Sequence, residues 1–144
     1  MKLSTRGRYG MRAMFDLALH TDEGPQSIRS VAGRAGVPEA YLEQLIPALK
    51  RAGLVTSARG AQGGCALARR PEEITAGDVL RALEGGLELV DCLDGEEACA
   101  RARDCPSRAV WRKLRDGINQ VVDGITLADM IGDYRRASAR EEGQ

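Results

Sequence analysis

Three cysteines in one short segment are the residues of this chain best suited to chemistry. They stand in "CLDGEEACARARDC", spaced C-x6-C-x5-C at Cys92, Cys99 and Cys105, and the chain has one further cysteine and one histidine. In a reducing compartment, clustered thiols favour metal or redox chemistry over structural disulfides. Zinc sites usually include a close C-x2-C pair, which is missing here, and a catalytic cysteine would need a base such as His20 close by in sequence or space.

Thiolates spread along a polar loop can instead surround a larger object. Iron–sulfur clusters take cysteine thiolates and admit other ligands at one corner, so these cysteines predict a cluster. The alternative, buried or idle thiols, fits less well because charged residues and Gly95 stand between them. The remaining cysteine, Cys65, is predicted to be a small buried apolar residue.

Length and charge indicate which partners to expect. The 144 residues suit one domain, or a small domain with an appendage. Residues 1–70 carry eleven Lys and Arg against five Asp and Glu, whereas residues 71–144 carry ten against sixteen, so a basic half precedes an acidic one. A basic half suggests a polyanionic partner. No apolar run approaches the ~20 residues of a membrane span and the start has no apolar leader, so we expect a cytoplasmic protein.

The basic half has the pattern of a helix-turn-helix. Ser27 can cap a short helix, Gly36 can take the positive φ of a tight turn, and Pro38 suits the first position of a second helix that ends at Gly53. Apolar residues recur at helical intervals in the two helices and in one before them. These are Met11, Met14, Phe15, Ala18 and Leu19; then Ile28, Val31, Ala32 and Ala35; then Tyr41, Leu42, Leu45, Ile46 and Leu49. Pro47 disagrees with the pattern, because a proline inside a helix removes a hydrogen bond; the helix should kink there or end earlier.

The segment "GLVTSARGAQGGCALAR" reads as strand, glycine-rich turn and strand, which is the hairpin wing of a winged helix. Arg59 at the tip of the wing can enter a narrow minor groove. The second helix of the motif enters the major groove, where Gln44 can pair with adenine and Glu43 can accept from cytosine. Tyr41 is expected to be partly core and partly a phosphate contact. The alternative for Glu43 is a solvated helix acid.

The acidic half is expected to begin with a helix capped by Thr75 and Asp78. Farther along, Trp111, Leu114, Ile118, Val121 and Ile125 are spaced 3, 4, 3 and 4 residues apart. Such a seam indicates two helices packed along their length, in a homodimer or within one chain, and a dimer suits DNA that presents paired half-sites.

These elements predict a mainly α fold: a winged helix-turn-helix with a small β-hairpin wing and a long C-terminal dimerisation helix. We expect a DNA-binding domain over residues 1–74 and a connecting helix with a cysteine-bearing cluster loop over 75–105. A dimerisation helix and a short C-terminal helix should span 106–136, followed by a disordered tail over 137–144.

Together, "MKLSTRGRYGMRAMFDLAL", "YLEQL", "GLVTSARGAQGG", the three cysteines and "AVWRKL" resemble the IscR-type winged-helix transcription regulators, which include the iron–sulfur-sensing IscR, NsrR and RirA types. The resemblance covers essentially the whole chain. It implies a homodimer with crossed dimerisation helices and a cluster held by the three cysteines, whose state sets DNA affinity. It also implies DNA contacts by Tyr41, Glu43, Gln44 and Arg59.

The chain departs from that family at the fourth cluster ligand. Arg108 stands where the IscR type has a histidine, and Arg8 stands where the NsrR type has an acid supplied by the other protomer. The first cysteine gap is also one residue longer than in those two types. Open candidates are an exchangeable small molecule and the side chains of Asp16, His20, Asp91, Asp94, Glu96, Glu97 and Asp104. Absence of the histidine favours a 4Fe-4S cluster over a 2Fe-2S cluster.

The sequence therefore predicts a cytoplasmic, homodimeric repressor and redox sensor, whose affinity for double-stranded operator DNA is switched by an iron–sulfur cluster bound by the three cysteines. One alternative is a thiol-redox or zinc-responsive regulator of the same fold without a cluster. Another is an adaptor that uses the fold as a scaffold and does not bind DNA. We do not expect an enzyme, because no nucleophile–base pair, P-loop or dinucleotide fingerprint appears.

Overall fold

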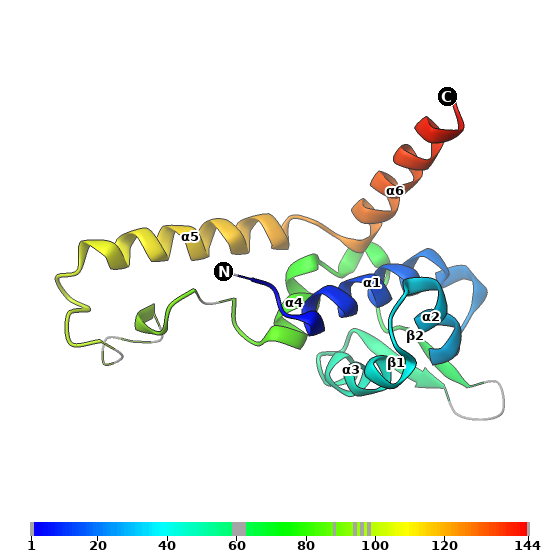
Figure 1. Ribbon diagram of the computed structural model, residues 1–144, viewed down its shortest axis with the longest axis horizontal. Coiled ribbons are helices and arrows are strands. Elements are labelled where there is room, and N and C mark those ends of the chain that lie inside the picture. The colour runs from blue at the N-terminus through cyan, green and yellow to red at the C-terminus, as the bar shows by residue number, and fades with distance from the viewer. Residues whose placement is uncertain are drawn as a thin grey trace.

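The computed structural model describes residues 2–58, 63–87, 89–93, 95, 97 and 99–143. These form a mostly helical fold with one antiparallel hairpin, as predicted (Figure 1). The α-helices are α1 (Thr5–Leu19), α2 (Ile28–Ala35), α3 (Glu39–Arg51), α4 (Ala76–Glu84), α5 (Pro106–Asp123) and α6 (Leu127–Glu142). The strands are β1 (Val55–Ala58) and β2 (Gly64–Leu67), and short 3-10 helices cover Thr21–Glu23, Pro71–Glu73 and Asp91–Leu93.

Helix α1 lies at the centre of a body built from α1 to α4, the hairpin and the start of α6. Glycine allows its closest contact, because a Cβ added at Gly7 or Gly10 would collide with Glu84 or Leu83 of α4. The core is aliphatic, which agrees with the scarcity of aromatic residues. Its fully buried large side chains include Met14, Val31, Leu42, Leu45, Leu49, Leu54, Ile74, Val79 and Leu127.

The apolar stripe predicted for α1 is partly wrong. Met14 and Ala18 are buried as expected, but the other buried apolar side chains of the helix are Ala13 and Leu17. Phe15 is only half-buried and meets Tyr134 of α6 edge to face, with ring centroids 5.4 Å apart. Since α2, α3, α4 and α6 all pack against α1, a single stripe could not describe its contacts.

Helices α4 and α6 start next to each other, because backbone hydrogen bonds join the residues at their starts. The predicted cap of α4 is present, with the Thr75 hydroxyl accepting from the Asp78 amide and the Asp78 carboxylate accepting from the Thr75 amide, both at 3.0 Å. Leu127 at the start of α6 donates its amide to the Ile74 carbonyl at 2.9 Å, and Ala76 donates to the Ile125 carbonyl at 2.7 Å. The chain that leaves α5 is therefore fastened to the start of α4.

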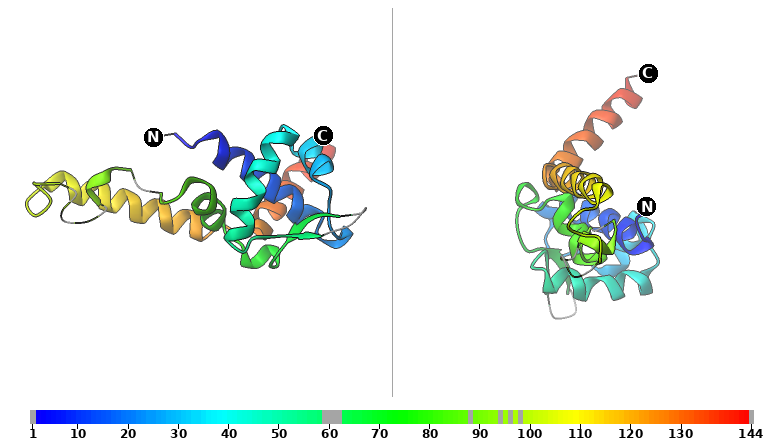
Figure 2. Two further views of the ribbon diagram at one scale, coloured as in Figure 1. Left: turned by 90° about the horizontal axis from the view of Figure 1, so that it is seen from below. Right: turned by 90° about the vertical axis from the view of Figure 1, so that its left-hand side faces the viewer.

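Helix α5 extends away from the body and carries the cysteine segment at its far end (Figures 1 and 2). None of its residues, all of which the structure describes, is buried. Its end near the body is held by Arg81, which donates to both carboxylate oxygens of Asp123 at 2.7 and 2.8 Å and to Asn119 at 2.9 Å. The predicted seam ends early, because α5 stops at Asp123 and Ile125 lies in the link to α6.

Two of the expected domain limits differ from the elements observed. Helix α4 packs on α1 and α3 and contributes Val79 and Leu83 to the core, so the limit at residue 74 falls inside the body. Helix α6 continues to Glu142, so residues 137–142 are helical where a disordered tail was predicted. Among the described residues, no helix has both the length and the apolar character that crossing a membrane requires.

Candidate nucleic-acid interface and cysteine segment

The turn between α2 and α3 has the geometry expected of a helix-turn-helix. Ser27 caps α2, its hydroxyl accepting from the Ser30 amide at 3.1 Å. Gly36 follows α2 with φ of 67° and ψ of 40°, in the left-handed region that side chains disfavour. Val37 is buried, so the turn is anchored in the core and α3 is held at a defined angle to α2.

One face of the first half of helix α3 is exposed to solvent. Glu43 and Gln44 are exposed, as their predicted place in a groove requires, and so are Glu39 and Ala40. Pro38 is the residue before the first helical position rather than the first helical residue itself. The exposed donor and acceptor groups of this half-helix are free to meet base edges in a groove.

Tyr41 is half-buried and belongs partly to the body. Its ring meets that of Tyr9 edge to face at 5.4 Å, and the Arg12 guanidinium lies 5.5 Å from the centre of the Tyr9 ring. These contacts join α3 to α1. Because Tyr41 packs against Tyr9 and is still partly exposed, helical periodicity alone could not assign it to the core or to the surface.

Pro47 lies inside α3, and the helix continues past it to Arg51, so the predicted early end is wrong. Pro47 is exposed, on the side of Glu43 and away from the buried Leu45 and Leu49. Having no N–H, it leaves the Glu43 carbonyl without its usual helical donor, on the side that faces solvent.

The wing is tied to the helix-turn-helix through Cys65. Val55 to Ala58 pair with Gly64 to Leu67, and Cys65 exchanges two backbone hydrogen bonds of 2.8 Å with Gln26, just before α2. Cys65 is buried as predicted, and burial raises the pKa of its thiol. Arg59, predicted at the tip, lies outside the described residues.

The three cysteines of the sensor prediction are free thiols and half-buried. Cys92 lies in the 3-10 helix Asp91–Leu93, and Cys105 is the residue that precedes α5, the helix whose first residue is Pro106. Soft thiol donors on one segment fit an iron–sulfur cluster by their chemistry. Over the residues described here, however, no three His, Cys, Asp or Glu side chains are arranged to hold one metal ion.

Arg108 holds the cysteine segment together. Its Nε donates to the Cys92 carbonyl at 3.1 Å and its Nη1 donates to the Ala102 carbonyl at 3.3 Å. Arg108 thus joins two points within the cysteine segment, the backbone of Cys92 and the backbone of Ala102. This role was missed in the sequence, because a cation in a charged segment carries no signal of its backbone partners.

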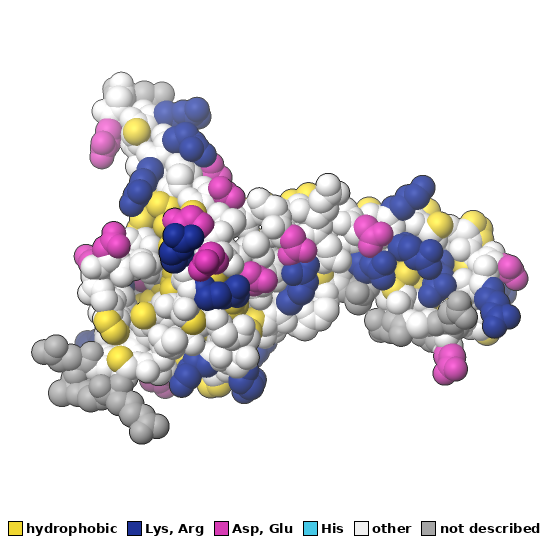
Figure 3. Space-filling view, turned by 180° about the vertical axis from the view of Figure 1, so that it is seen from behind, with side chains coloured by type: hydrophobic (Ala, Val, Ile, Leu, Met, Phe, Trp, Pro, Cys, Tyr) yellow, Lys and Arg dark blue, Asp and Glu magenta, His cyan; other side chains and the backbone are white. Residues whose placement is uncertain are grey.

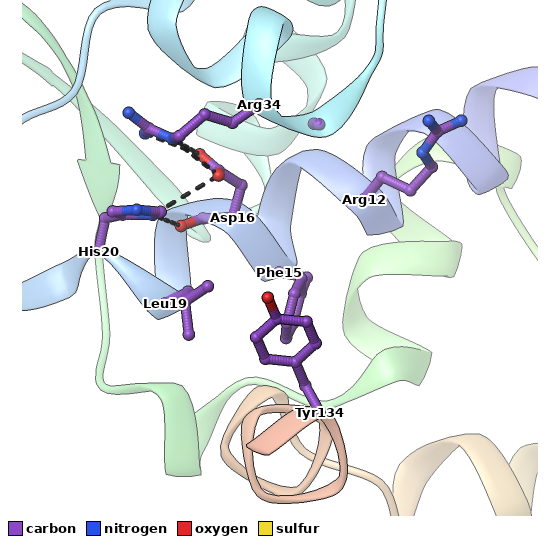
Figure 4. Close-up of a pocket in the computed structure, with 8 residues that line it drawn as sticks. Arg12, Phe15, Asp16, Leu19, His20, Arg34 and Tyr134 are labelled. Carbon is purple, nitrogen blue, oxygen red and sulfur yellow. Dashed lines mark hydrogen bonds and ion pairs between the residues drawn. The ribbon is translucent and has the colours of Figure 1, made fainter. Parts of the chain in front are cut away.

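Two of the candidate fourth ligands are used elsewhere in the chain (Figure 4). Asp16 is buried and accepts from the Nε and Nη2 of Arg34, both at 2.9 Å, which raises the pKa of Arg34. The Nδ1 of His20 lies 2.8 Å from the Asp16 carbonyl. Both residues belong to the body, at the opposite end of the molecule from the cysteines.

The other candidate acids lie beside the cysteines in sequence. Asp91, Glu97 and Asp104 are exposed. Asp94 and Glu96 lie outside the described residues.

Comparison with known proteins by sequence and by fold leads to one family. The model of the Rrf2 family, described as an iron-dependent transcriptional regulator, matches residues 3–133. The HTH-type transcriptional regulator CymR of Bacillus subtilis (strain 168) is 45% identical over 130 residues, which are 90% of this chain and 89% of that protein.

Solved structures agree. T. potens IscR is 48% identical with a TM-score of 0.78, over 95% of this chain and 90% of that one. The structure of CymR, named the global cysteine regulator of B. subtilis, is 43% identical with a TM-score of 0.74, over 90% of this chain and 95% of that one. These matches extend over nearly the whole chain, and the winged-helix body agrees with them. The chain therefore belongs to the Rrf2 family of transcriptional regulators.

Proposed function

We propose that this chain is a homodimeric cytoplasmic repressor that binds operator DNA and whose DNA affinity depends on an iron–sulfur cluster held by Cys92, Cys99 and Cys105. The observation that carries the proposal is the exposed first half of α3, held by a glycine turn and a buried Val37 beside an anchored wing. Gln44 would pair with adenine and Glu43 would accept from cytosine N4.

The remaining DNA contacts would surround these two residues. Tyr41 would reach a phosphate from its place between α1 and α3, and Arg59 of the wing would enter the minor groove. Phosphate contacts fix the position of a protein on the duplex, whereas base contacts select the sequence.

The support for a dimer comes from α5. Its side chains Val110, Leu114 and Val121 are 51%, 46% and 61% exposed, which is unusual for three apolar residues on one helix. A second copy of α5 would cover them, and the two-fold symmetry of the dimer would match paired half-sites in DNA.

The three cysteines would serve as cluster ligands once their segment closes around the cluster. With no histidine at position 108, a site of three cysteine ligands would leave one iron open to an outside ligand, which favours a 4Fe-4S cluster. When bound, such a cluster supplies iron that responds to oxygen, nitric oxide or thiols.

Helix α5 offers a route from the cysteines to the DNA-reading helix. Cys105 directly precedes α5, and the other end of α5 is joined through Asp123 to Arg81 of α4. Helix α4 packs on α1 and α3. A changed tilt of α5 would therefore alter the spacing of the two recognition helices, and a difference of a few kcal/mol between two arrangements changes DNA occupancy strongly.

The second candidate is a regulator of the same fold that responds to cysteine oxidation or zinc without a cluster. The name of CymR as a global cysteine regulator favours it, as does Arg108 in the place of a ligand. A DNA-independent adaptor is the third, and the exposed polar face of α3 favours it less than either regulator.

One experiment separates these functions. The protein is purified without oxygen, and its iron, sulfide and zinc are measured. Its binding to duplexes selected from a random pool is then followed by anisotropy at several salt concentrations. We expect a brown protein whose DNA affinity falls steeply with salt and differs at least about tenfold between cluster-loaded and stripped forms.

Variants assign the residues. Cys99→Ala should lose the iron, whereas Cys65→Ala, which removes a buried thiol from the wing, should keep it. Gln44→Ala should weaken specific binding by about 1–3 kcal/mol. A colourless protein with zinc or a reversible Cys–Cys link supports the second candidate, and feeble binding in every form overturns DNA regulation.

A further inference from the structure

The segment around the start of α5 is strongly basic although it lies in the acidic half of the chain. Residues 101–115 include six Lys or Arg and one acid. Figure 3 shows Lys and Arg side chains gathered on the arm that extends from the body. A basic run on a helix is often no more than a solvated face, so its shape decides whether it can hold a ligand.

Part of this basic surface is hollow. A cavity of about 490 Å³ is lined by Ala102, Arg103, Cys105, Arg108, Ala109 and Arg112. Positions 108 and 109 are each three or four residues from both 105 and 112, so the four lie on one side of the start of α5. Arg103 comes from the preceding turn and completes the wall.

Within the described residues, the arginines of this cavity form no ion pair with a carboxylate. Other arginines of the chain pair with acids, as Arg34 does with Asp16 and Arg81 with Asp123. None of the ion pairs between described residues includes Arg103, Arg108 or Arg112.

Arg108 has a second role in the same wall. Its Nε and Nη1 donate to the backbone carbonyls of Cys92 and Ala102, so its guanidinium is fixed in place by two uncharged partners. A guanidinium held in this way is positioned before a ligand arrives, which lowers the entropy lost on binding.

We propose that this cavity binds a small anion, a molecule with a carboxylate or phosphate group, against the thiol of Cys105. Guanidinium groups donate pairs of parallel hydrogen bonds that match both oxyanions. The positive end of the dipole of the 18-residue α5 also favours negative charge. The inference goes beyond the proposed function, because it requires neither DNA nor a cluster.

An anion in this cavity would lie beside one of the three thiols proposed as ligands. Occupancy of the cavity and the chemistry of Cys105 would then be coupled, and each would change the free energy of the other by the same amount. A small acidic metabolite could thus act on the same segment as the cluster.

Alkylation of the full-length, reduced, cluster-free protein tests the proposal. Iodoacetate carries a negative charge and iodoacetamide does not, so the ratio of their rates at one thiol reports attraction of anions and cancels intrinsic reactivity. Peptide mass spectrometry gives this ratio for each cysteine. The arginines that line the cavity should make the ratio at Cys105 about threefold or more above that at Cys92 and Cys99.

Three variants and two competitors complete the test. Arg112→Gln and Arg103→Gln should lower the ratio at Cys105 toward that of the other cysteines. Lys113→Gln removes one charge from a neighbouring position that does not line the cavity and should leave the ratio unchanged. At constant ionic strength, inorganic phosphate or succinate should slow alkylation of Cys105 relative to chloride, and the stronger of the two identifies the preferred group.

Several results would overturn the anion site. These are an equal ratio at all three cysteines, an equal loss in Lys113→Gln and Arg112→Gln, or no protection by either anion. The comparison among cysteines of the unmodified chain stands even if a variant fails to fold. Since the assay contains no DNA and no iron, its failure leaves the proposed regulation untouched.

Discussion

Asp16 is a buried carboxylate whose neighbours explain its position. Both of its oxygens accept from Arg34, and the Arg34 Nη2 also donates to the Gln26 side chain at 3.0 Å. Arg34 thus joins α1, α2 and the segment before α2, which is itself hydrogen-bonded to the wing through Gln26. A buried carboxylate that loses its partner destabilises a fold by several kcal/mol, so this acid serves the body and cannot be spared for a metal within the same chain.

Gly36 and Gly33 provide a matched test of the turn. Gly36→Ala should destabilise the protein by about 1–2 kcal/mol, because a side chain at positive φ is strained and the new Cβ would lie 2.6 Å from the Arg12 Nη2. Gly33→Ala should stabilise it by about 0.5–1 kcal/mol, since Gly33 is exposed within α2 and has open space around it. Urea unfolding measures both, and equal effects of the two changes would contradict the left-handed turn.

At the scale of elements, the joint between α4 and α5 is the connection that the proposed signal transfer would need. Arg81 reaches across to Asp123 and Asn119, and a Cβ added at Gly77 would collide with Asp123, so the helices cross closely at this point. The pair is exposed and its stabilisation is modest. Its value lies in setting the angle between arm and body.

The pH dependence of this joint follows from Asp123. The hydrogen bond from Arg81 lowers the pKa of Asp123 below its ordinary value of 3.8. A lowered pKa adds stability above the ordinary value, and this contribution is lost as the pH falls through the folded-state pKa. The difference in unfolding free energy between the wild type and Asp123→Asn should therefore be constant from pH 7 to about pH 5 and vanish at more acidic pH.

The control is the same substitution in an Arg81→Met background. Without the guanidinium, Asp123→Asn should show little of this pH dependence. A pH profile that persists in the absence of Arg81 would show that another group perturbs the carboxyl. Urea unfolding at pH 7, 5, 4 and 3 makes the comparison.

At the scale of the whole molecule, one chain leaves apolar surface uncovered along α5. Val110, Leu114 and Val121 are exposed, while Ile118 and Val122 line a groove of about 320 Å³ between α5, the start of the chain and the end of α4. The groove also contains Leu3, Leu80, Leu87 and Leu89. We propose that the α5 of a second copy covers these surfaces.

Leu114→Glu tests this arrangement. A charge at the centre of the proposed helix pair should raise the dimer dissociation constant about a hundredfold or more, because two buried leucines become two unpaired carboxylates. Gln120→Glu adds the same charge to an exposed polar position of the same helix and should leave the dimer intact. Analytical ultracentrifugation would decide, and a wild type that sediments as a monomer at micromolar concentration would refute the dimer.

Much of the body could be predicted because its signals are local. The Ser27 and Thr75 caps, the turn at Gly36, the hairpin and the buried Cys65 each depend on a few neighbouring residues, and each is found where expected. The exposed positions of α3 follow from helical periodicity in the same way. Such features follow from backbone sterics and hydrogen bonding over one or two turns, which a short stretch of sequence already specifies.

The features that needed the folded chain all depend on residues far apart in sequence. Tyr134 packs edge to face against Phe15. Arg34 pairs with Asp16, Arg81 pairs with Asp123, and Arg108 donates a hydrogen bond to the Cys92 carbonyl. A charged side chain can pair with any of many partners, so its sequence neighbourhood does not identify the one that packing places within hydrogen-bond distance. The exposed face of α3 therefore follows from local pattern, whereas the ion pair that fastens α5 to α4 and the hydrogen bond from Arg108 to the Cys92 backbone depend on long-range packing.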